Sequence, residues 1–194
     1  MTRLLIYAGP NGSGKSSLRV STSAAIEPVD VVIDPDQIAR AISPLNLRAA
    51  DREAGRRAVK LFNASLGAGR SISLETTLAG RSVLRRIREA REVGYHVELR
   101  YIALASVEMN IQRVRARAAR GGHFIEPEDI RRRYVSSLNN LPAAIALAHR
   151  VVVSDNTEAR PCPVIEIAEG RVIHRVTPLP VWLIHACPDL SGGG

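Results

Sequence analysis

The stretch Gly9-Pro10-Asn11-Gly12-Ser13-Gly14-Lys15-Ser16 decides how the rest of this 194-residue sequence is interpreted. It fits the pattern G-x-x-x-x-G-K-[ST], a phosphate-binding loop whose glycines let the backbone curl closely around a polyphosphate. An apolar run, RLLIYA at 3–8, precedes the loop, and a predicted helix from Ser16 into the twenties follows it. The pattern requires this strand and helix on either side, so a chance glycine-rich turn is a poor explanation.

Each part of the loop has an expected role. Lys15 is expected to neutralise the β- and γ-phosphates of a nucleotide, and the Ser16 hydroxyl to hold Mg²⁺. The helix that follows presents the positive end of its dipole to the same phosphates. The residues expected to bind the nucleotide are Gly9, Asn11, Gly12, Ser13, Gly14, Lys15, Ser16 and Ser17.

Strand and helix patterns alternate along the chain. We expect strands at 3–8, 30–34, 71–77, 97–105 and 150–153, and helices starting at 16, 35, 49, 80, 107 and 127. Parallel neighbours need helical crossovers, so the pattern predicts a three-layer α/β fold with a mostly parallel five-stranded sheet. A β-hairpin is expected at 164–176, turned at Glu169-Gly170. We expect one domain over 1–180 and a partly disordered tail over 181–194.

The composition limits the classes of protein to consider. Hydrophobic residues make up 45% and charged residues 24% of the chain, which excludes intrinsic disorder and provides enough apolar side chains for a core. Cys162 and Cys187 show neither metal-ligand nor disulfide spacing, and no stretch approaches the length of a membrane span. We therefore expect a cytoplasmic protein that makes no membrane contact.

Positive charge dominates the sequence. The formal net charge is +8, and the basic residues other than Lys15 and Lys60 are all arginines. Such a surface attracts nucleic acid, anionic membranes or phosphorylated small molecules, and charge alone leaves the three open. Aromatic residues make up only 4% of the chain, which weighs against recognition of single-stranded nucleic acid by base stacking.

Polar residues follow the second and third predicted strands. Asp34 and Asp36 lie two residues apart, so in a continuing strand both point to one side, toward the phosphate loop. A carboxylate there can accept the proton of a hydroxyl that attacks a γ-phosphate. Alternatively, Asp36 only caps the helix that follows it. Glu75 and Thr77 repeat the arrangement and are candidates for binding substrate hydroxyls or a metal-bound water.

A basic helix and a glycine pair predict a mobile lid. Arg113, Arg117 and Arg120 share one face of the helix at 107–120, and Gly121-Gly122 follows. We expect at least one of these arginines to act on a transferring phosphoryl group, although each arginine by itself also suits a solvated surface. His123 is a candidate lid contact or substrate ligand, because no second histidine or cysteine lies at metal-ligand spacing.

These motifs together resemble the zeta-toxin-like group of P-loop kinases. The resemblance extends over about the first 155 residues and is considerably more specific than the phosphate loop alone. It rests on GPNGSGKSS at 9–17, VIDPD at 32–36, LETTLAGR at 74–81, RVRARAARGGH at 113–123 and PEDIRRRYVSSLNNL at 127–141.

The resemblance implies a nucleoside-kinase-like P-loop fold and an ATP- and Mg²⁺-dependent phosphotransferase. It places Asp36 at the catalytic base and Glu75 and Thr77 at substrate-binding positions. Asp34 is a further candidate, either for binding substrate, for assisting the metal or for supporting Asp36. Arg117 matches a lid arginine of the phosphoryl site, and Arg120 or Arg133 provides another. In the toxin members the acceptor is a hydroxyl of UDP-N-acetylglucosamine, and an antitoxin protein blocks the nucleotide site.

The favoured hypothesis is therefore a kinase that phosphorylates a hydroxyl of a small molecule, with a UDP-sugar as leading candidate. A second hypothesis is a nucleic-acid-binding protein or nucleotide switch, and a third is a polynucleotide 5′-kinase. These alternatives predict that the protein binds polynucleotide and that its affinity falls steeply as the salt concentration rises. The low aromatic content weighs against both.

Overall fold

The apolar run Arg3–Ala8 forms strand β1 in the interior of the sheet, and Leu4, Ile6 and Tyr7 have almost no exposed surface. The computed structural model describes residues 1–23, 28–43 and 47–190. The other strands are β2 (Val31–Ile33), β3 (Ile72–Thr76), β4 (His96–Ala103), β5 (Arg150–Asp155), β6 (Cys162–Ala168) and β7 (Arg171–Arg175). The helices are α1 (Lys15–Ser23), α2 (Pro35–Ile42), α3 (Leu47–Gly67), α4 (Arg81–Glu92), α5 (Val107–Ala118), α6 (Pro127–Leu147) and α7 (Val181–Ala186), with a 3₁₀ turn at Pro188–Leu190.

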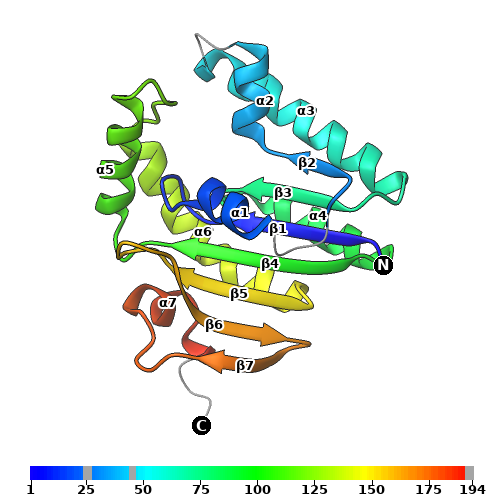
Figure 1. Ribbon diagram of the computed structural model, residues 1–194, viewed down its shortest axis with the longest axis vertical. Helices are drawn as coiled ribbons and strands as arrows, with labels where there is room; N and C mark the ends of the chain where they lie inside the picture. Colours follow the sequence, from blue (N-terminus) through cyan, green and yellow to red (C-terminus); the bar gives the residue numbers. More distant parts are fainter. Residues whose placement is uncertain (24–27, 44–46, 191–194) are drawn as a thin grey trace.

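The strands form one sheet in the order β2-β3-β1-β4-β5-β6-β7 (Figure 1). The first five strands in this order are parallel to one another, as the alternation of strands and helices predicts. Helices α4 and α6 lie side by side on one face of the sheet and α1 lies on the other, so the α/β, three-layer prediction is confirmed (Figure 1).

The prediction of a five-stranded sheet is wrong, because the sheet has seven strands. Strand β6 pairs antiparallel with β5, and β7 pairs antiparallel with β6, so the predicted C-terminal hairpin continues the sheet instead of standing apart from it. The predicted turn is present, with positive φ angles at Glu169 and Gly170. The reason for the difference is that the amphipathic strand β6 buries Ile165 and Ile167 by extending the open edge of β5.

The carboxyl ends of the parallel strands bring the candidate residues to one edge of the sheet. The phosphate loop follows β1, Asp34 follows β2, and Thr77 follows β3. The loop is tied to β3 by a hydrogen bond from Gly9 N to Thr76 O of 3.3 Å. Ligands of open α/β sheets bind outside this edge, so the topology itself places the site.

The C-terminal segment contributes to the main core. The predicted domain ends at residue 180, whereas Trp182 and Leu183 of α7 are buried among the core side chains. The indole Nε1 of Trp182 donates a hydrogen bond to Asp155 Oδ2 at 2.5 Å, which ties α7 to the end of β5. Residues 191–194 lie outside the described part of the chain.

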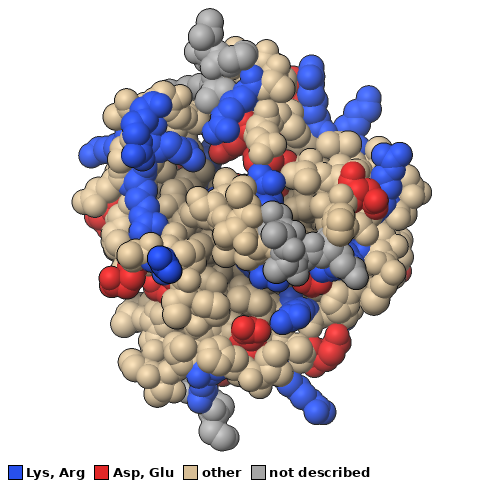
Figure 2. Space-filling view, in the orientation of Figure 1, with Lys and Arg blue, Asp and Glu red and all other residues tan. Residues whose placement is uncertain are grey.

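The described helices include none that is long and apolar enough to cross a membrane. Figure 2 shows Lys and Arg side chains, in blue, gathered over α5 near the hollow of this face.

Replacing the core residue Trp182 tests whether α7 belongs to the domain. We expect Trp182→Ala to lower the free energy of unfolding by about 3–5 kcal/mol, because it removes a buried aromatic side chain and its hydrogen bond. The measurement is urea unfolding followed by circular dichroism. Val181→Ala is the matched control, since Val181 is 66% exposed and its replacement is expected to change stability by less than about 0.5 kcal/mol. Equal stability of the two variants would contradict the assignment.

Candidate active site

The phosphate loop has the tight geometry that its glycines allow. Gly14 has a φ of 105°, and a Cβ built on it would lie 2.5 Å from the side-chain nitrogen of Asn156. That nitrogen donates to the carbonyl oxygen of Ser13 at 2.8 Å, and the side-chain nitrogen of Asn110 donates to the carbonyl of Asn11 at 2.6 Å. Two asparagines from distant segments therefore fix the loop backbone.

Lys15 is buried at the base of the loop. Its Nζ donates to the carbonyl oxygen of Pro10 at 2.9 Å. Burial lowers the pKa of Lys15, whereas the neighbouring carboxylates of Glu75 and Asp36 raise it. A buried ammonium group at a phosphate loop suits a polyanionic ligand, because the charge of the ligand offsets the cost of keeping the ammonium group out of water.

A polar network joins α1 to the ends of β2 and β3. The Ser16 hydroxyl donates to Glu75 Oε1 at 2.8 Å. Arg19 lies 3.2 Å from Asp34 and 3.5 Å from Glu75, so one guanidinium group holds both carboxylates. Burial raises the pKa of Glu75, and the charge of Lys15 opposes this shift.

The structure separates the roles of the two aspartates after β2. Asp34 is the N-cap of α2, because its Oδ1 accepts hydrogen bonds from Asp36 N at 3.0 Å and Gln37 N at 3.2 Å. The alternative interpretation, in which Asp36 caps this helix, is therefore wrong. Pro35 occupies the first helical position and Asp36 the second, so the Asp36 carboxylate is available for another role.

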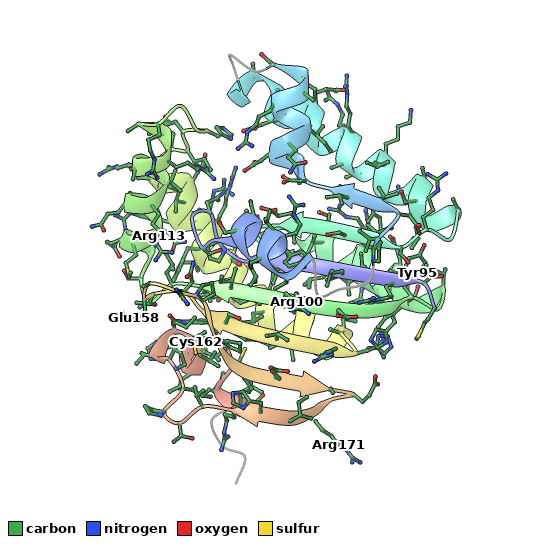
Figure 3. The ribbon with its side chains drawn as sticks, in the orientation of Figure 1. Tyr95, Arg100, Arg113, Glu158, Cys162 and Arg171 are labelled. Atoms are coloured by element: carbon green, nitrogen blue, oxygen red, sulfur yellow. The ribbon has the colours of Figure 1, made fainter. Side chains whose placement is uncertain are left out.

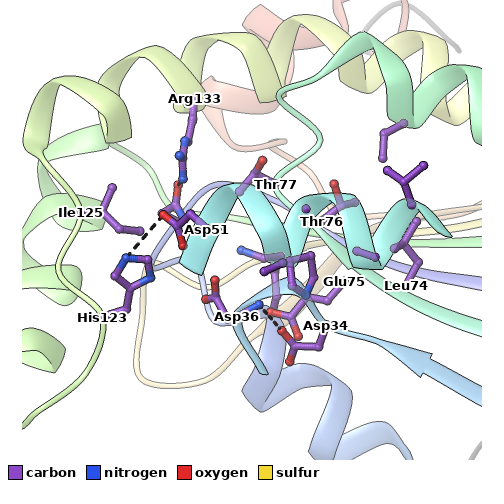
Figure 4. Close-up of a pocket in the computed structure, with 18 of the residues that line it drawn as sticks. Asp34, Asp36, Asp51, Leu74, Glu75, Thr76, Thr77, His123, Ile125 and Arg133 are labelled. Atoms are coloured by element: carbon purple, nitrogen blue, oxygen red, sulfur yellow. Dashed lines mark hydrogen bonds and ion pairs between the residues drawn. The ribbon is translucent and has the colours of Figure 1, made fainter. Parts of the chain in front are cut away.

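Two cavities open on either side of the phosphate loop. The larger, about 690 Å³, lies between the loop, α5 and residues 156–161, and Ser16, Ser17, Arg113, Arg117 and Arg120 line it. The smaller, about 360 Å³, is walled by α3, and Thr77, His123 and Arg133 line it (Figure 4). Both cavities share the same five residues at their junction: Asn11, Lys15, Asp34, Asp36 and Glu75.

The predicted lid arginines have different partners. Arg113 donates to the carbonyl oxygen of Asn156 at 2.8 Å, and Figure 3 labels it on α5. Arg117 donates from Nη2 to the carbonyl oxygen of His123 at 3.3 Å, while its buried Nε has no partner among the described residues. Arg133 reaches Asn11 Oδ1 at 3.4 Å. Arg117 therefore keeps an unused donor beside the larger cavity.

Three residues that organise the site were not predicted from the sequence. Arg19 follows Lys15 by four residues on α1 and so lies on the same helix face, which is a signal that the sequence contains. Asn110 and Asn156 hold the phosphate loop from α5 and from the end of β5, and only the folded chain brings them to it.

The donor set suits Mg²⁺. The Ser16 hydroxyl and the Glu75 carboxylate, which contact each other, are hard oxygen ligands of the kind that Mg²⁺ prefers. No cluster of three or more His, Cys, Asp or Glu side chains with metal-binding geometry occurs in the described ranges. Mg²⁺ needs no such cage, because it is commonly held by one or two protein oxygens together with phosphates and water.

Comparison with known proteins identifies relatives. A protein-family model described as "Zeta toxin" matches residues 3–164. A Haemophilus influenzae protein, described as uncharacterized, is 42% identical over 132 residues, which make up 68% of this chain and 92% of the relative.

Two solved structures share the fold. A chain of the AvrRxo1-ORF1:-ORF2 complex with ATP is similar with a TM-score of 0.74 and 17% identity, over 100% of this chain and 66% of that chain. The PezAT toxin-antitoxin system of Streptococcus pneumoniae is similar with a TM-score of 0.62 and 15% identity, over 96% of this chain and 78% of that chain. This chain thus spans slightly less than two thirds of the AvrRxo1 chain.

Replacing Gly14 tests whether the loop binds a nucleotide. We expect Gly14→Ala to weaken ATP binding at least about tenfold, because the methyl group strains the backbone and displaces Asn156 from Ser13. Isothermal titration calorimetry measures the affinity. Gly94→Ala is the matched control, because Gly94 also has a positive φ, of 87°, but its Cβ would meet nothing within 4 Å. Unchanged ATP affinity in Gly14→Ala would contradict the loop's role.

Proposed function

This chain belongs to the zeta-toxin family, and we propose that it is a kinase that transfers the γ-phosphoryl group of ATP to a hydroxyl of a small-molecule acceptor. The observation that carries the proposal is the junction of the two cavities. Lys15 and Asp36 line both of them, so a nucleotide in one and an acceptor in the other would meet at these two side chains.

The larger cavity is the proposed ATP site. The phosphates of ATP would be surrounded by the backbone N–H groups of the phosphate loop, the start of α1 and the Lys15 ammonium group. Ser16 and Glu75 would hold Mg²⁺, which supplies positive charge to the β- and γ-phosphates when bound. The solved AvrRxo1 complex with ATP supports this assignment by its shared fold.

Asp36 is the proposed catalytic base. The Asp36 carboxylate makes no hydrogen bond to any described residue, so it is available to an acceptor. The Asp34 carboxylate, by contrast, caps α2 and pairs with Arg19. The acceptor hydroxyl gives its proton to Asp36 while its oxygen attacks the γ-phosphorus, and the bond from that phosphorus to the bridging oxygen of ADP breaks. The products are ADP and a phosphorylated acceptor.

Arginines are the proposed stabilisers of the transferring group. Arg117 carries a buried Nε without a partner in the described structure and lines the ATP cavity, so it is the best placed of them. Arg120 lines the same cavity, and Arg133 approaches the phosphate loop from the acceptor side. Guanidinium groups bind the equatorial oxygens of a phosphoryl group and offset the charge that builds up during transfer.

The smaller cavity is the proposed acceptor site, and a UDP-sugar such as UDP-N-acetylglucosamine is the leading acceptor. Thr77, His123 and the carboxylates of Asp34 and Glu75 offer hydrogen-bonding groups for sugar hydroxyls. Small side chains of α3, Ala54 and Ala58 among them, leave one wall of this cavity open to a bulky group.

An antitoxin-like protein partner is part of the same proposal. PezAT is described as a toxin-antitoxin system, and AvrRxo1-ORF1 was solved together with ORF2. By analogy with these two systems, this chain is proposed to bind a protein partner of the same kind.

Asp36→Asn tests the proposed reaction. We expect the variant to lose acceptor-stimulated ADP release by at least about 100-fold while it binds ATP with nearly unchanged affinity, because only the proton acceptor is removed. The assay measures ADP release with UDP-sugars, free sugars and 5′-hydroxyl oligonucleotides as acceptors. Lys15→Ala is expected to lose ATP binding, and Asp189→Asn, in the distant 3₁₀ turn, serves as the neutral control.

Retained transfer in Asp36→Asn would overturn the base assignment. Tight ATP binding without stimulation by any acceptor, together with salt-sensitive binding of polynucleotide, would favour the nucleotide-switch hypothesis instead. Stimulation by the oligonucleotides alone would identify a polynucleotide 5′-kinase.

A further inference from the structure

The loop after α5 is held in one conformation by the end of that helix. Gly122 N donates to the carbonyl oxygen of Arg117, and Gly121 N donates to that of Ala118, both at 3.0 Å. With a φ of 83° at Gly121, this is a Schellman cap. A Cβ on Gly122 would lie 2.9 Å from the Arg117 carbonyl oxygen, so the chain passes close to the helix. The cap therefore fixes where the next residue, His123, leaves the helix.

His123 carries a buried nitrogen that lacks a partner. The residue is 8% exposed, and its Nδ1 has no hydrogen bond to any described residue. His123 lines the acceptor cavity, so a molecule bound there would lie beside its imidazole ring. An unpaired buried polar atom costs free energy in the unliganded protein, and a ligand that pairs with it recovers that cost.

Asp51 faces the other nitrogen of the same ring. Asp51 lies on α3, and its Oδ2 is 3.8 Å from Nε2 of His123 in the loop after α5. Both residues line the acceptor cavity. Figure 4 shows this contact as a dashed line, with Asp36 on the same side of the pocket. The negative charge of Asp51 favours a proton on Nε2, which leaves the lone pair of a neutral imidazole on Nδ1.

We propose that Asp51 is a positioning residue that holds His123 with Nε2 protonated, so that Nδ1 accepts a hydrogen bond from the acceptor. The proposal rests on the proposed kinase function. The reacting hydroxyl is assigned to Asp36, so the group that contacts His123 is a second donor, a hydroxyl or an N–H. The acceptor class is therefore a polyhydroxylated or amide-bearing molecule, and a simple alcohol lacks one of the two contacts.

Two substitutions at His123 distinguish its nitrogens. In His123→Asn the side-chain amide lies near the former Nδ1, whereas in His123→Gln it reaches the former Nε2. We expect His123→Gln to raise the KM of the acceptor about tenfold and His123→Asn to raise it much less, with kcat changed little in both. The probe is UDP-N-acetylglucosamine or whichever acceptor stimulates ADP release most. A larger KM effect for Asn than for Gln would overturn the assignment of Nδ1.

Asp51→Ala tests the positioning role. We expect it to raise the KM of the acceptor several-fold in the wild-type background and to have no further effect in His123→Asn, where no Nε2 remains for Asp51 to hold. Glu53→Gln is the matched control on the same helix, because among the described residues Glu53 forms its ion pairs with the exposed Arg56 and Arg57. Additive effects of Asp51→Ala and His123→Asn would refute the pairing.

The protonated nitrogen can be identified without any acceptor. Long-range ¹H–¹⁵N spectra of the full chain at pH 8, with the His123 signals assigned by their loss in His123→Gln, are expected to show a proton on Nε2 and none on Nδ1. A proton on Nδ1 would overturn the inference even if the kinase reaction is established. Failure of the kinase proposal is recognised separately, because wild-type ADP release would then respond to no acceptor.

Discussion

Two buried carboxylates at the carboxyl edge of the sheet, Asp34 and Glu75, are held by the one guanidinium group of Arg19, and the rest of the site depends on that arrangement. Burying a carboxylate without a partner is costly, so the three side chains are constrained to one geometry. That geometry ties α1 to the ends of β2 and β3. It also sets Glu75 against the Ser16 hydroxyl and Asp34 against the start of α2.

One consequence of this constraint is that Asp34 has a structural role, which leaves Asp36 for the proposed role of catalytic base. Because Asp34 satisfies the first N–H groups of α2 and pairs with Arg19, Asp36 keeps a carboxylate that faces both cavities. The buried ammonium group of Lys15 lies at the same junction and carries the opposite charge. Direct transfer between two bound molecules requires such a junction, whereas a nucleotide switch does not.

Much of the fold follows from local pattern. Strands flanked by helices, the Gly-Lys-Ser loop and the Glu169-Gly170 turn all depend on neighbouring residues, so the sequence predicts them. The joining of β6 to β5 and the burial of Trp182 depend on long-range packing, which no local pattern encodes. The site divides in the same way. Loop residues are predictable from a motif, whereas Asn156 and Asp51 reach it only through the fold.

The most direct test of the proposed phosphotransfer is to follow the γ-phosphoryl group itself. The full chain is incubated with Mg²⁺, γ-³²P-labelled ATP and UDP-N-acetylglucosamine or the best acceptor of the panel, and the products are separated. We expect the label to move to a hydroxyl of the acceptor and Asp36→Asn to stop this transfer. Label found only in inorganic phosphate would contradict this expectation, because the two cavities would then not place ATP and acceptor in contact.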